Sequence, residues 1–177
     1  MKKILTLGKP RYIAFVAASV DGRISLLSKT IPDWTSKEDQ RFFYRSLAKV
    51  GAVVVGRNTY KAAAARLRQR NTFLFSNRIA ATRRRGTVTF INPARVNLGV
   101  MFANYKTVAI LGGGRVYQTM LEKNLLDEIY ITIEPLVFGR GKEMFVGAVR
   151  TTQLRLLSAR RLNRSGTLLL HYKVKHL

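Results

Sequence analysis

The sequence predicts an α/β fold in which strands and helices alternate along the chain. Short apolar runs typical of buried strands, such as residues 12–18, 52–55 and 107–111, are separated by segments with a helical pattern. The chain has 177 residues, of which 47% are hydrophobic. This length allows one domain with a substantial core and is too short for two ordinary domains. We therefore expect a single α/β domain over residues 1–177.

The first half of the chain contains three clear elements. Residues 12–18 form an almost continuous apolar run and predict a buried strand. A helix is expected from Ser36, a residue type that caps helices, to about Val50. Residues 52–55 predict a second buried strand, and a helix is expected over residues 59–67.

The remaining elements follow from the same signals. Further strands are expected at residues 72–75, 87–91, 107–111 and 129–134. A short helix is expected to begin at Pro93, and the helix after the three glycines is expected to end near Lys123. The run Arg83–Arg85 is expected in an exposed loop. Residues 153–161 and 167–174 predict a terminal antiparallel hairpin across the turn at residues 163–166.

Basic residues dominate the charge of the chain. Lys and Arg total 32 against 9 Asp and Glu, and no acidic residue occurs from Gln40 to Leu121. Such a field attracts phosphate-bearing cofactors, phosphate-bearing substrates or nucleic acid, although it also fits a uniformly basic, solvated surface. The cations are scattered through elements with core patterns, and Phe73, Phe75 and Phe90 lie in apolar strand patterns, so no nucleic-acid partner is expected.

Composition also argues against a metal site and a membrane segment. The chain has no cysteine, and His171 and His176 have no ligand-like neighbours in the sequence. No apolar window approaches the length of a membrane span. We therefore expect a cytoplasmic protein without a bound metal.

The segment from Val108 to Tyr117 is the most informative part of the sequence. A buried strand runs into Gly112, Gly113 and Gly114, and a helical pattern follows. Residues without a Cβ let a ligand approach the backbone, and the free N–H groups of the next helix favour an anion. The sequence therefore predicts a phosphate or pyrophosphate site, with a plain tight turn as the alternative.

Asp39 is the acidic residue most in need of an explanation. It lies four residues before Phe43, on the same side of the predicted helix as the apolar stripe, where a carboxylate is costly unless it is paired or used. A second interpretation is that Asp39 completes a capping box with Ser36. Glu38 is the alternative acid. We expect Asp39 to face a pocket.

Separated motifs that cover nearly the whole chain resemble one known superfamily. They are Ser-Val-Asp-Gly-Arg-Ile at 19–24, Trp34 followed by Asp39, Val-Gly-Arg-Asn-Thr-Tyr at 55–60, residues 110–117, Leu-Asp-Glu at 126–128, and Pro-Leu-Val-Phe-Gly-Arg-Gly at 135–141 with Phe145. This set resembles the dihydrofolate reductase-like superfamily, in particular its branch with the riboflavin-pathway reductase domain (the RibD C-terminal domain). The resemblance implies a twisted, mostly parallel sheet with flanking helices, NADPH as cofactor, and hydride transfer to a C=N or C=O bond of a heterocyclic substrate.

The resemblance also assigns cofactor-binding residues. It places Arg57 at the 2′-phosphate of NADPH and Gly112 to Arg115 at the pyrophosphate. Ser76, Asn77 and Arg78 match the adenosine-phosphate segment, although Ser76 alone fits turn chemistry. The other residues implied to line the cofactor are Ala17, Ala18, Gly56, Asn58, Thr59, Leu111, Val116 and Tyr117.

The catalytic assignment rests on Asp39 and Thr132. Asp39 follows Trp34 by five residues, the spacing of many dihydrofolate reductases, and this implies that its carboxylate binds an aminopyrimidine-like edge and supports protonation of the imine. Thr132 matches a threonine that assists this contact, although it also fits an ordinary strand residue. Trp34 and Phe43 are expected beside the substrate.

Departures from the family patterns leave two substrates open. Residues 61–65 read Lys-Ala-Ala-Ala-Ala where riboflavin-pathway enzymes usually carry Asp-Asp-Pro-Arg-Leu, and no clear segment for a folate tail is present. A folate glutamate would have to be held by Arg66, Arg68 or Arg70. We expect a pteridine-type substrate, with a riboflavin-pathway phosphoribosylamino-pyrimidine as the alternative and a basic nucleic-acid-binding module as a distant one. The resemblance is compatible with a homodimer.

Overall fold

The computed structural model describes residues 8–26, 34–147 and 150–176. Its helices are α1 (Lys37–Leu47), α2 (Arg57–Leu67), α3 (Leu98–Phe102) and α4 (Gly114–Glu122). Its strands are β1 (Arg11–Ser19), β2 (Arg23–Ser25), β3 (Ala52–Gly56), β4 (Thr72–Phe75), β5 (Thr82–Arg85), β6 (Val88–Ile91), β7 (Thr107–Ile110), β8 (Glu128–Glu134), β9 (Lys142–Glu143), β10 (Leu154–Arg161) and β11 (Leu168–Val174).

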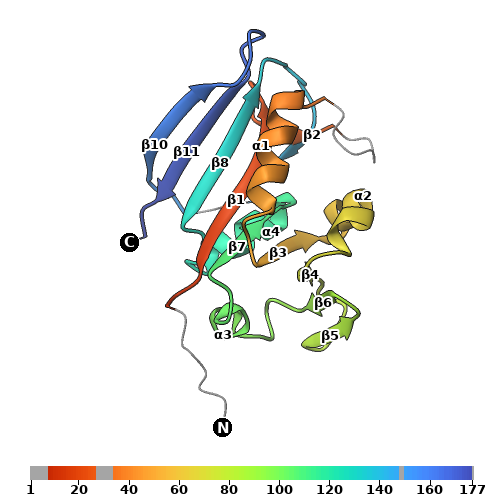
Figure 1. The fold of residues 1–177 in the computed structure, drawn as a ribbon. Helices are drawn as coiled ribbons and strands as arrows, with labels where there is room; N and C mark the ends of the chain where they lie inside the picture. The colour runs from red at the N-terminus through yellow and green to blue at the C-terminus, as the bar shows by residue number, and fades with distance from the viewer. Residues whose placement is uncertain (1–7, 27–33, 148–149, 177) are drawn as a thin grey trace.

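Nine strands form one sheet in the order β10-β11-β8-β1-β7-β3-β4-β6-β5 (Figure 1). The six strands from β8 to β6 are parallel to one another. At the two sides, β11 is antiparallel to β8, β10 to β11, and β5 to β6. The carboxyl ends of the parallel strands therefore meet at one edge of the sheet, where ligands of open α/β sheets bind. This is the α/β fold, mostly parallel and closed by an antiparallel pair, that the sequence predicts.

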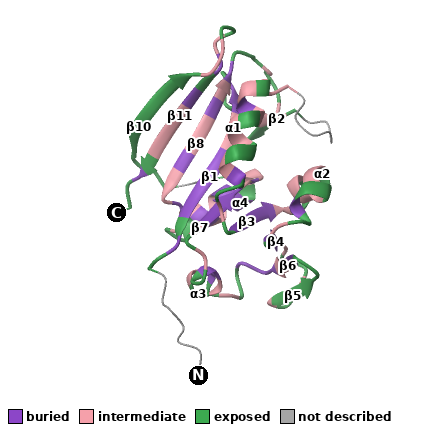
Figure 2. Ribbon diagram, in the orientation of Figure 1, coloured by how far each residue is buried: buried purple, intermediate pink, exposed green. Residues whose placement is uncertain are grey.

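Two apolar layers cover the faces of the sheet. On one face, α1 and α2 pack through Leu47 and Leu67 against Phe15 and Val53. On the other face, α3 and α4 pack through residues such as Phe102 and Met120. Figure 2 shows the resulting burial, with the central strands covered and β5 and β10 exposed at the two margins. Within the described ranges, no helix combines the length and the apolar character that a membrane span requires.

Two local expectations are wrong, and one short pair of strands was not expected. The run Arg83–Arg85 is exposed, but it belongs to strand β5, which pairs with β6; an exposed edge strand carries no apolar pattern from which to recognise it. The helix expected from Pro93 begins at Leu98, because the Asn97 side chain accepts from the Val100 N–H and caps α3 there. The short pair of β2 and β9 gives no sequence signal.

Candidate functional site

Asp39 is a buried carboxylic acid in the first turn of α1. Asp39 is only 8% exposed. The Ser36 side chain caps the helix by accepting from the Asp39 N–H at 3.2 Å. The Thr132 side chain, on a β8 residue that is 2% exposed, faces the Asp39 carboxyl and acts to lower its pKa. The structure thus brings together the two residues that the sequence assigned to catalysis.

Glu134 completes this polar cluster, and sequence reasoning missed it. It is 3% exposed and lies two residues after Thr132, on the same face of β8. Its carboxylate accepts from the Ser36 N–H and from the Thr167 hydroxyl, both at 2.7 Å. The one available signal was a Glu at an alternating position of a partly apolar strand.

The contact with Glu134 decides between the interpretations of Asp39. In a capping box, the side chain of Asp39 would accept from the Ser36 N–H. Glu134 occupies that donor, so the reciprocal half of the box is absent. Glu38, the alternative acid, points outward and bonds to Arg41 and Asn163. Asp39 is therefore the buried acid at this helix end, and its side chain does not serve as a cap.

The surroundings of Asp39 favour its protonated form. Burial raises the pKa of the Asp39 carboxyl above its usual value. The hydroxyls of Thr132 and Thr35 oppose this by stabilising the carboxylate, whereas the nearby charge of Glu134 adds to the increase in pKa. Asp39 can consequently hold a proton at a higher pH than an exposed aspartate.

The parallel register sets this acid beside the expected nicotinamide position. Ala17 on β1 pairs with Thr132, and Ser19 pairs with Glu134. Ala17 is partly exposed, whereas Ala18 is buried on the opposite face. The last residues of β1 therefore form a floor of small side chains next to the Asp39–Thr132 pair.

Two helix N-termini meet at the neighbouring strand ends. The Gly56 N–H at the end of β3 donates to the Gly112 carbonyl oxygen after β7 at 2.7 Å. The N-caps of α2 and α4 are Gly56 and Gly113, and no side chain caps either helix. Their first N–H groups remain available to an anion. The peptide bond between Gly112 and Gly113 is cis.

The three glycines of the turn have different surroundings. A Cβ on Gly113 would meet only the Thr59 hydroxyl, at 3.9 Å, so its Cα faces open space. A Cβ on Gly114 would lie 2.6 Å from Val146 Cγ2 and 2.7 Å from the Glu143 carbonyl oxygen. Gly113 thus leaves room for a ligand, whereas Gly114 leaves room for the chain itself.

The other residues expected at the cofactor divide by exposure. Arg57, Asn58, Asn77, Arg78 and Arg115 are exposed at the carboxyl edge of the sheet. The partly exposed residues there are Gly56, Thr59, Ser76 and Leu111. The Ser76 hydroxyl accepts from the Arg78 N–H at 3.3 Å, which is the turn chemistry that the sequence left as an alternative.

Two residues expected at the cofactor have buried side chains. Val116 and Tyr117 are 4% and 2% exposed. The Tyr117 hydroxyl donates to the Phe15 carbonyl oxygen at 2.6 Å, and its ring lies directly beneath Gly112. These two side chains support the turn from below.

The two residues expected at the substrate, Trp34 and Phe43, each pack against another aromatic ring. Trp34 packs edge-on against Phe138, with 5.0 Å between ring centroids. Phe43 lies one helical turn after Asp39 and packs against Phe15.

Asp21 fixes the loop that carries Phe138. It accepts from the Phe138 and Gly139 N–H groups at 3.0 and 2.9 Å. A hydrogen bond from the Ser19 hydroxyl, followed by the Phe138 N–H, lowers the pKa of Asp21 to about 2. This acid therefore joins two sequence motifs, at 19–24 and 135–141, into one wall of the site.

Comparisons with known proteins agree with this arrangement. The dihydrofolate reductase family profile matches residues 12–152, and no curated protein matches the chain. A putative riboflavin biosynthesis protein from Shewanella sp. PV-4 is 21% identical, with a TM-score of 0.70 over 94% of this chain and 99% of its own. A pyrimidine reductase-like protein from Corynebacterium diphtheriae is 16% identical, with a TM-score of 0.74 over 95% and 93%.

A longer relative has the same fold over part of its length. RibD from Acinetobacter baumannii is 18% identical, with a TM-score of 0.77 over 95% of this chain, which spans 59% of the RibD chain. At these identities the solved structures establish the fold alone. The family profile covers most of the chain and includes both Asp39 and the glycine turn. The chain belongs to the dihydrofolate reductase family, a family of reductases.

Proposed function

We propose that the protein is an NADPH-dependent reductase that transfers a hydride to a C=N bond of a pteridine-type substrate. The observation that carries this proposal is the buried Asp39–Thr132 pair, set one strand away from Ala17 and next to the uncapped helix ends. A buried acid with a raised pKa, next to a sheet edge that suits a nucleotide, fits proton-coupled hydride transfer.

The residues present fit NADPH. The open space at Gly113 and the free N–H groups of α2 and α4 suit a pyrophosphate. Arg57 and Arg78 are exposed beside them and can bind a 2′-phosphate. No acidic residue lies between positions 40 and 121 to accept a ribose 2′-hydroxyl, which favours NADPH over NADH. When bound, NADPH would supply the hydride and leave as NADP⁺.

In this proposal Asp39 binds the substrate and supports its protonation. The carboxyl group hydrogen-bonds an N–C–NH₂ edge, and the Thr132 hydroxyl holds the carboxyl in that orientation. One proton from solvent adds to the imine nitrogen while the hydride adds to the adjacent carbon, so that C=N becomes CH–NH. The raised pKa of Asp39 keeps a proton available at the site.

A hollow between α1 and α2 favours a substrate with an anionic tail. It has a volume of about 330 Å³ and is lined by residues that include Tyr44, Arg66 and Arg70. The Arg70 guanidinium donates to the Leu47 carbonyl oxygen at 2.8 Å, and Arg66 lies 4.4 Å from the centre of the Tyr44 ring. Two of the three arginines considered for a folate glutamate thus share one hollow.

The alternative substrate is a riboflavin-pathway phosphoribosylamino-pyrimidine. The names of the solved relatives support it, and its phosphate would suit the same arginines. Purified protein with NADPH, offered dihydrofolate and then the aminopyrimidine, tests both substrates through the loss of NADPH absorbance. If the protein turns over neither substrate, the proposal is rejected. A homodimer stays a prediction, checked by light scattering.

A further inference from the structure

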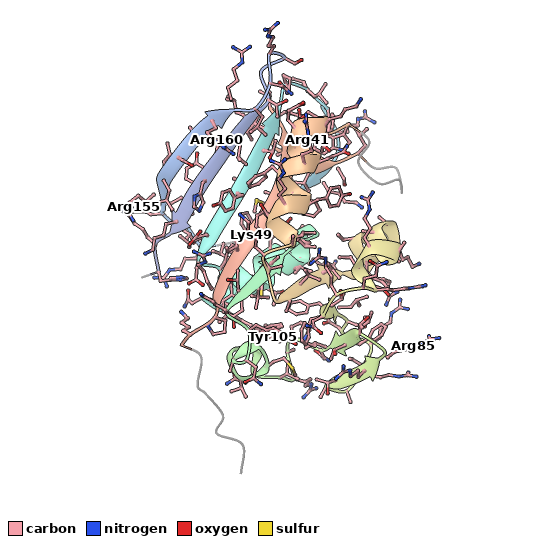
Figure 3. All side chains as sticks on the ribbon, in the orientation of Figure 1. Arg41, Lys49, Arg85, Tyr105, Arg155 and Arg160 are labelled. Carbon is pink, nitrogen blue, oxygen red and sulfur yellow. The ribbon has the colours of Figure 1, made fainter. Side chains whose placement is uncertain are left out.

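A basic groove runs along the flank of α1 that faces β10. Its volume is about 590 Å³, and the residues lining it are Glu38, Arg41, Phe42, Arg45, Ser46, Lys49, Arg160 and Leu162. Four of these eight residues are cations and one is an acid. Figure 3 shows Arg41 on α1 and Lys49 just past its end, with Arg160 and Arg155 on strand β10.

The helical wall of the groove carries its cations in one row. Arg41 and Arg45 are exposed one helical turn apart on α1, roughly 6 Å along its axis, and the exposed Lys49 follows just beyond the end of the helix. Like charges at this spacing repel each other and destabilise a helix. An anionic strand laid along the row would relieve this repulsion and could bring successive phosphates to successive cations.

The strand wall repeats this pattern. In the antiparallel register Arg155 pairs directly with Lys173, and Arg160 pairs with Leu169. Directly opposed like charges destabilise a sheet. These side chains share a face with His171, which stacks on Tyr130 beneath α1, and therefore face the groove side of the sheet.

Little negative charge compensates the groove. Its acid, Glu38, already pairs with Arg41 and accepts from Asn163. Among the residues that the structure describes, no acid lies within 4.0 Å of the charged nitrogens of Arg45, Lys49 or Arg160. The field of the groove is therefore open to a ligand from solution.

One aromatic ring lies between the basic walls. Phe42 is partly exposed in the groove and packs from below against Tyr130, with 5.3 Å between ring centroids. The sequence argued against a nucleic-acid surface because its aromatic residues lay in strand patterns away from the arginines. The fold brings Phe42 and the cations of two distant segments together, which provides a stacking platform inside a positive channel.

We propose that the groove between α1 and β10 binds single-stranded nucleic acid, with the phosphates on its arginines and lysine and one base on Phe42. A concave channel with a row of cations suits a flexible strand rather than a flat membrane surface. The groove lies on the flank of α1 opposite the hollow at Tyr44 and away from the proposed cofactor residues. The proposal is therefore independent of the reductase activity.

The test uses the full chain and a fluorescein-labelled twelve-residue oligodeoxythymidine, followed by anisotropy over a range of salt concentrations. The groove variant carries Arg45→Gln, Lys49→Gln and Arg160→Gln. The matched control carries Arg83→Gln, Arg84→Gln and Arg85→Gln on β5, which removes the same charge at the far margin of the sheet. Thermal melting establishes whether each variant is folded. If a triple variant is unfolded, the corresponding single substitutions are used in its place.

We expect the groove variant to bind the oligonucleotide at least about tenfold more weakly near 150 mM salt, and its salt slope to fall by about 2. The control should change affinity less than about threefold. Equal losses in both variants would mean that net charge alone attracts the oligonucleotide, and the proposal would fail. It would also fail if inorganic polyphosphate competed equally well at equal phosphate concentration, because no base would then be recognised. NADPH turnover should be unchanged in the groove variant.

Discussion

Replacing Asp39 by Asn should slow the reductase and stabilise the fold at the same time. Asn keeps the size of the side chain and an oxygen that can accept from Thr132, but it cannot ionise. The helix keeps its cap, because the cap is the Ser36 hydroxyl and the donor is the backbone N–H of residue 39. The substitution therefore removes a charge and leaves the architecture in place.

The stability change follows from the raised pKa of Asp39. The folded protein holds this proton more tightly than the unfolded chain, so ionisation of Asp39 destabilises the fold as the pH rises above the unfolded value of about 3.9. Each unit of increase in pKa costs about 1.4 kcal/mol at neutral pH. We expect Asp39→Asn to raise the free energy of unfolding at pH 7 and to have little effect near pH 4.

The kinetic change should have the opposite sign. Loss of the acid should lower the rate of hydride transfer by about 10²–10⁴-fold at neutral pH, with NADPH affinity nearly unchanged. The deficit should shrink at low pH, where solvent protonates the substrate. Urea unfolding at pH 7 and 4, together with single-turnover kinetics, measures both effects. A variant with lower stability and an unchanged rate would show that Asp39 has only a structural role.

Three further substitutions test the rest of the site. Glu134→Gln keeps the acceptor for the Ser36 N–H but removes a charge that adds to the effect of burial on the pKa of Asp39, so the fall in activity with rising pH should begin at lower pH; an unmoved profile would assign Glu134 to structure alone. Arg57→Ala should weaken NADPH by about 1.5–3 kcal/mol and NADH much less, as measured by fluorescence titration, and equal losses would remove Arg57 from the 2′-phosphate site. Gly113→Ala should fold normally and bind NADPH at least about tenfold more weakly. Gly114→Ala should lower the melting temperature, because its Cβ meets Val146 and Glu143. Normal NADPH binding by the Gly113 variant would make the glycine run an ordinary turn.

The parts of the fold that the sequence predicted are those with a periodic apolar signal. The run at 12–18 and the strand before the glycine turn become β1 and β7, which lie side by side in the centre of the sheet. Strand β5 was missed because every residue in it is exposed, and β2 and β9 because they are too short to show a period. Strand β10 is exposed throughout as well, and the sequence predicted it as one strand of a hairpin across the turn at residues 163–166.

The site was predictable where a residue departed from its local pattern. Asp39 interrupts an apolar helix stripe, whereas Thr132 was assigned through the family resemblance, and both are buried in the structure. Glu134 departs from the pattern in the same way, but its role depends on Ser36, 98 positions earlier, and on Thr167 in β11. Contacts between distant segments cannot be read from local spacing.

The cost of these buried polar groups explains the packing around them. Thr132 and Glu134 are buried polar residues at the carboxyl end of β8, and with Asp39 of α1 they put two carboxyl groups in one buried cluster, which weakens the fold. Farther along the same face, Phe15, Tyr130 and His171 form a continuous stack, with ring centroids 5.4 and 3.9 Å apart, and Phe42 closes over it from α1. That stack attaches the middle of α1 to the sheet, and the hydrogen bond from the Ser36 N–H to Glu134 attaches its start. The helix can therefore hold an ionisable group at its N-terminus, because its position is also fixed from its middle.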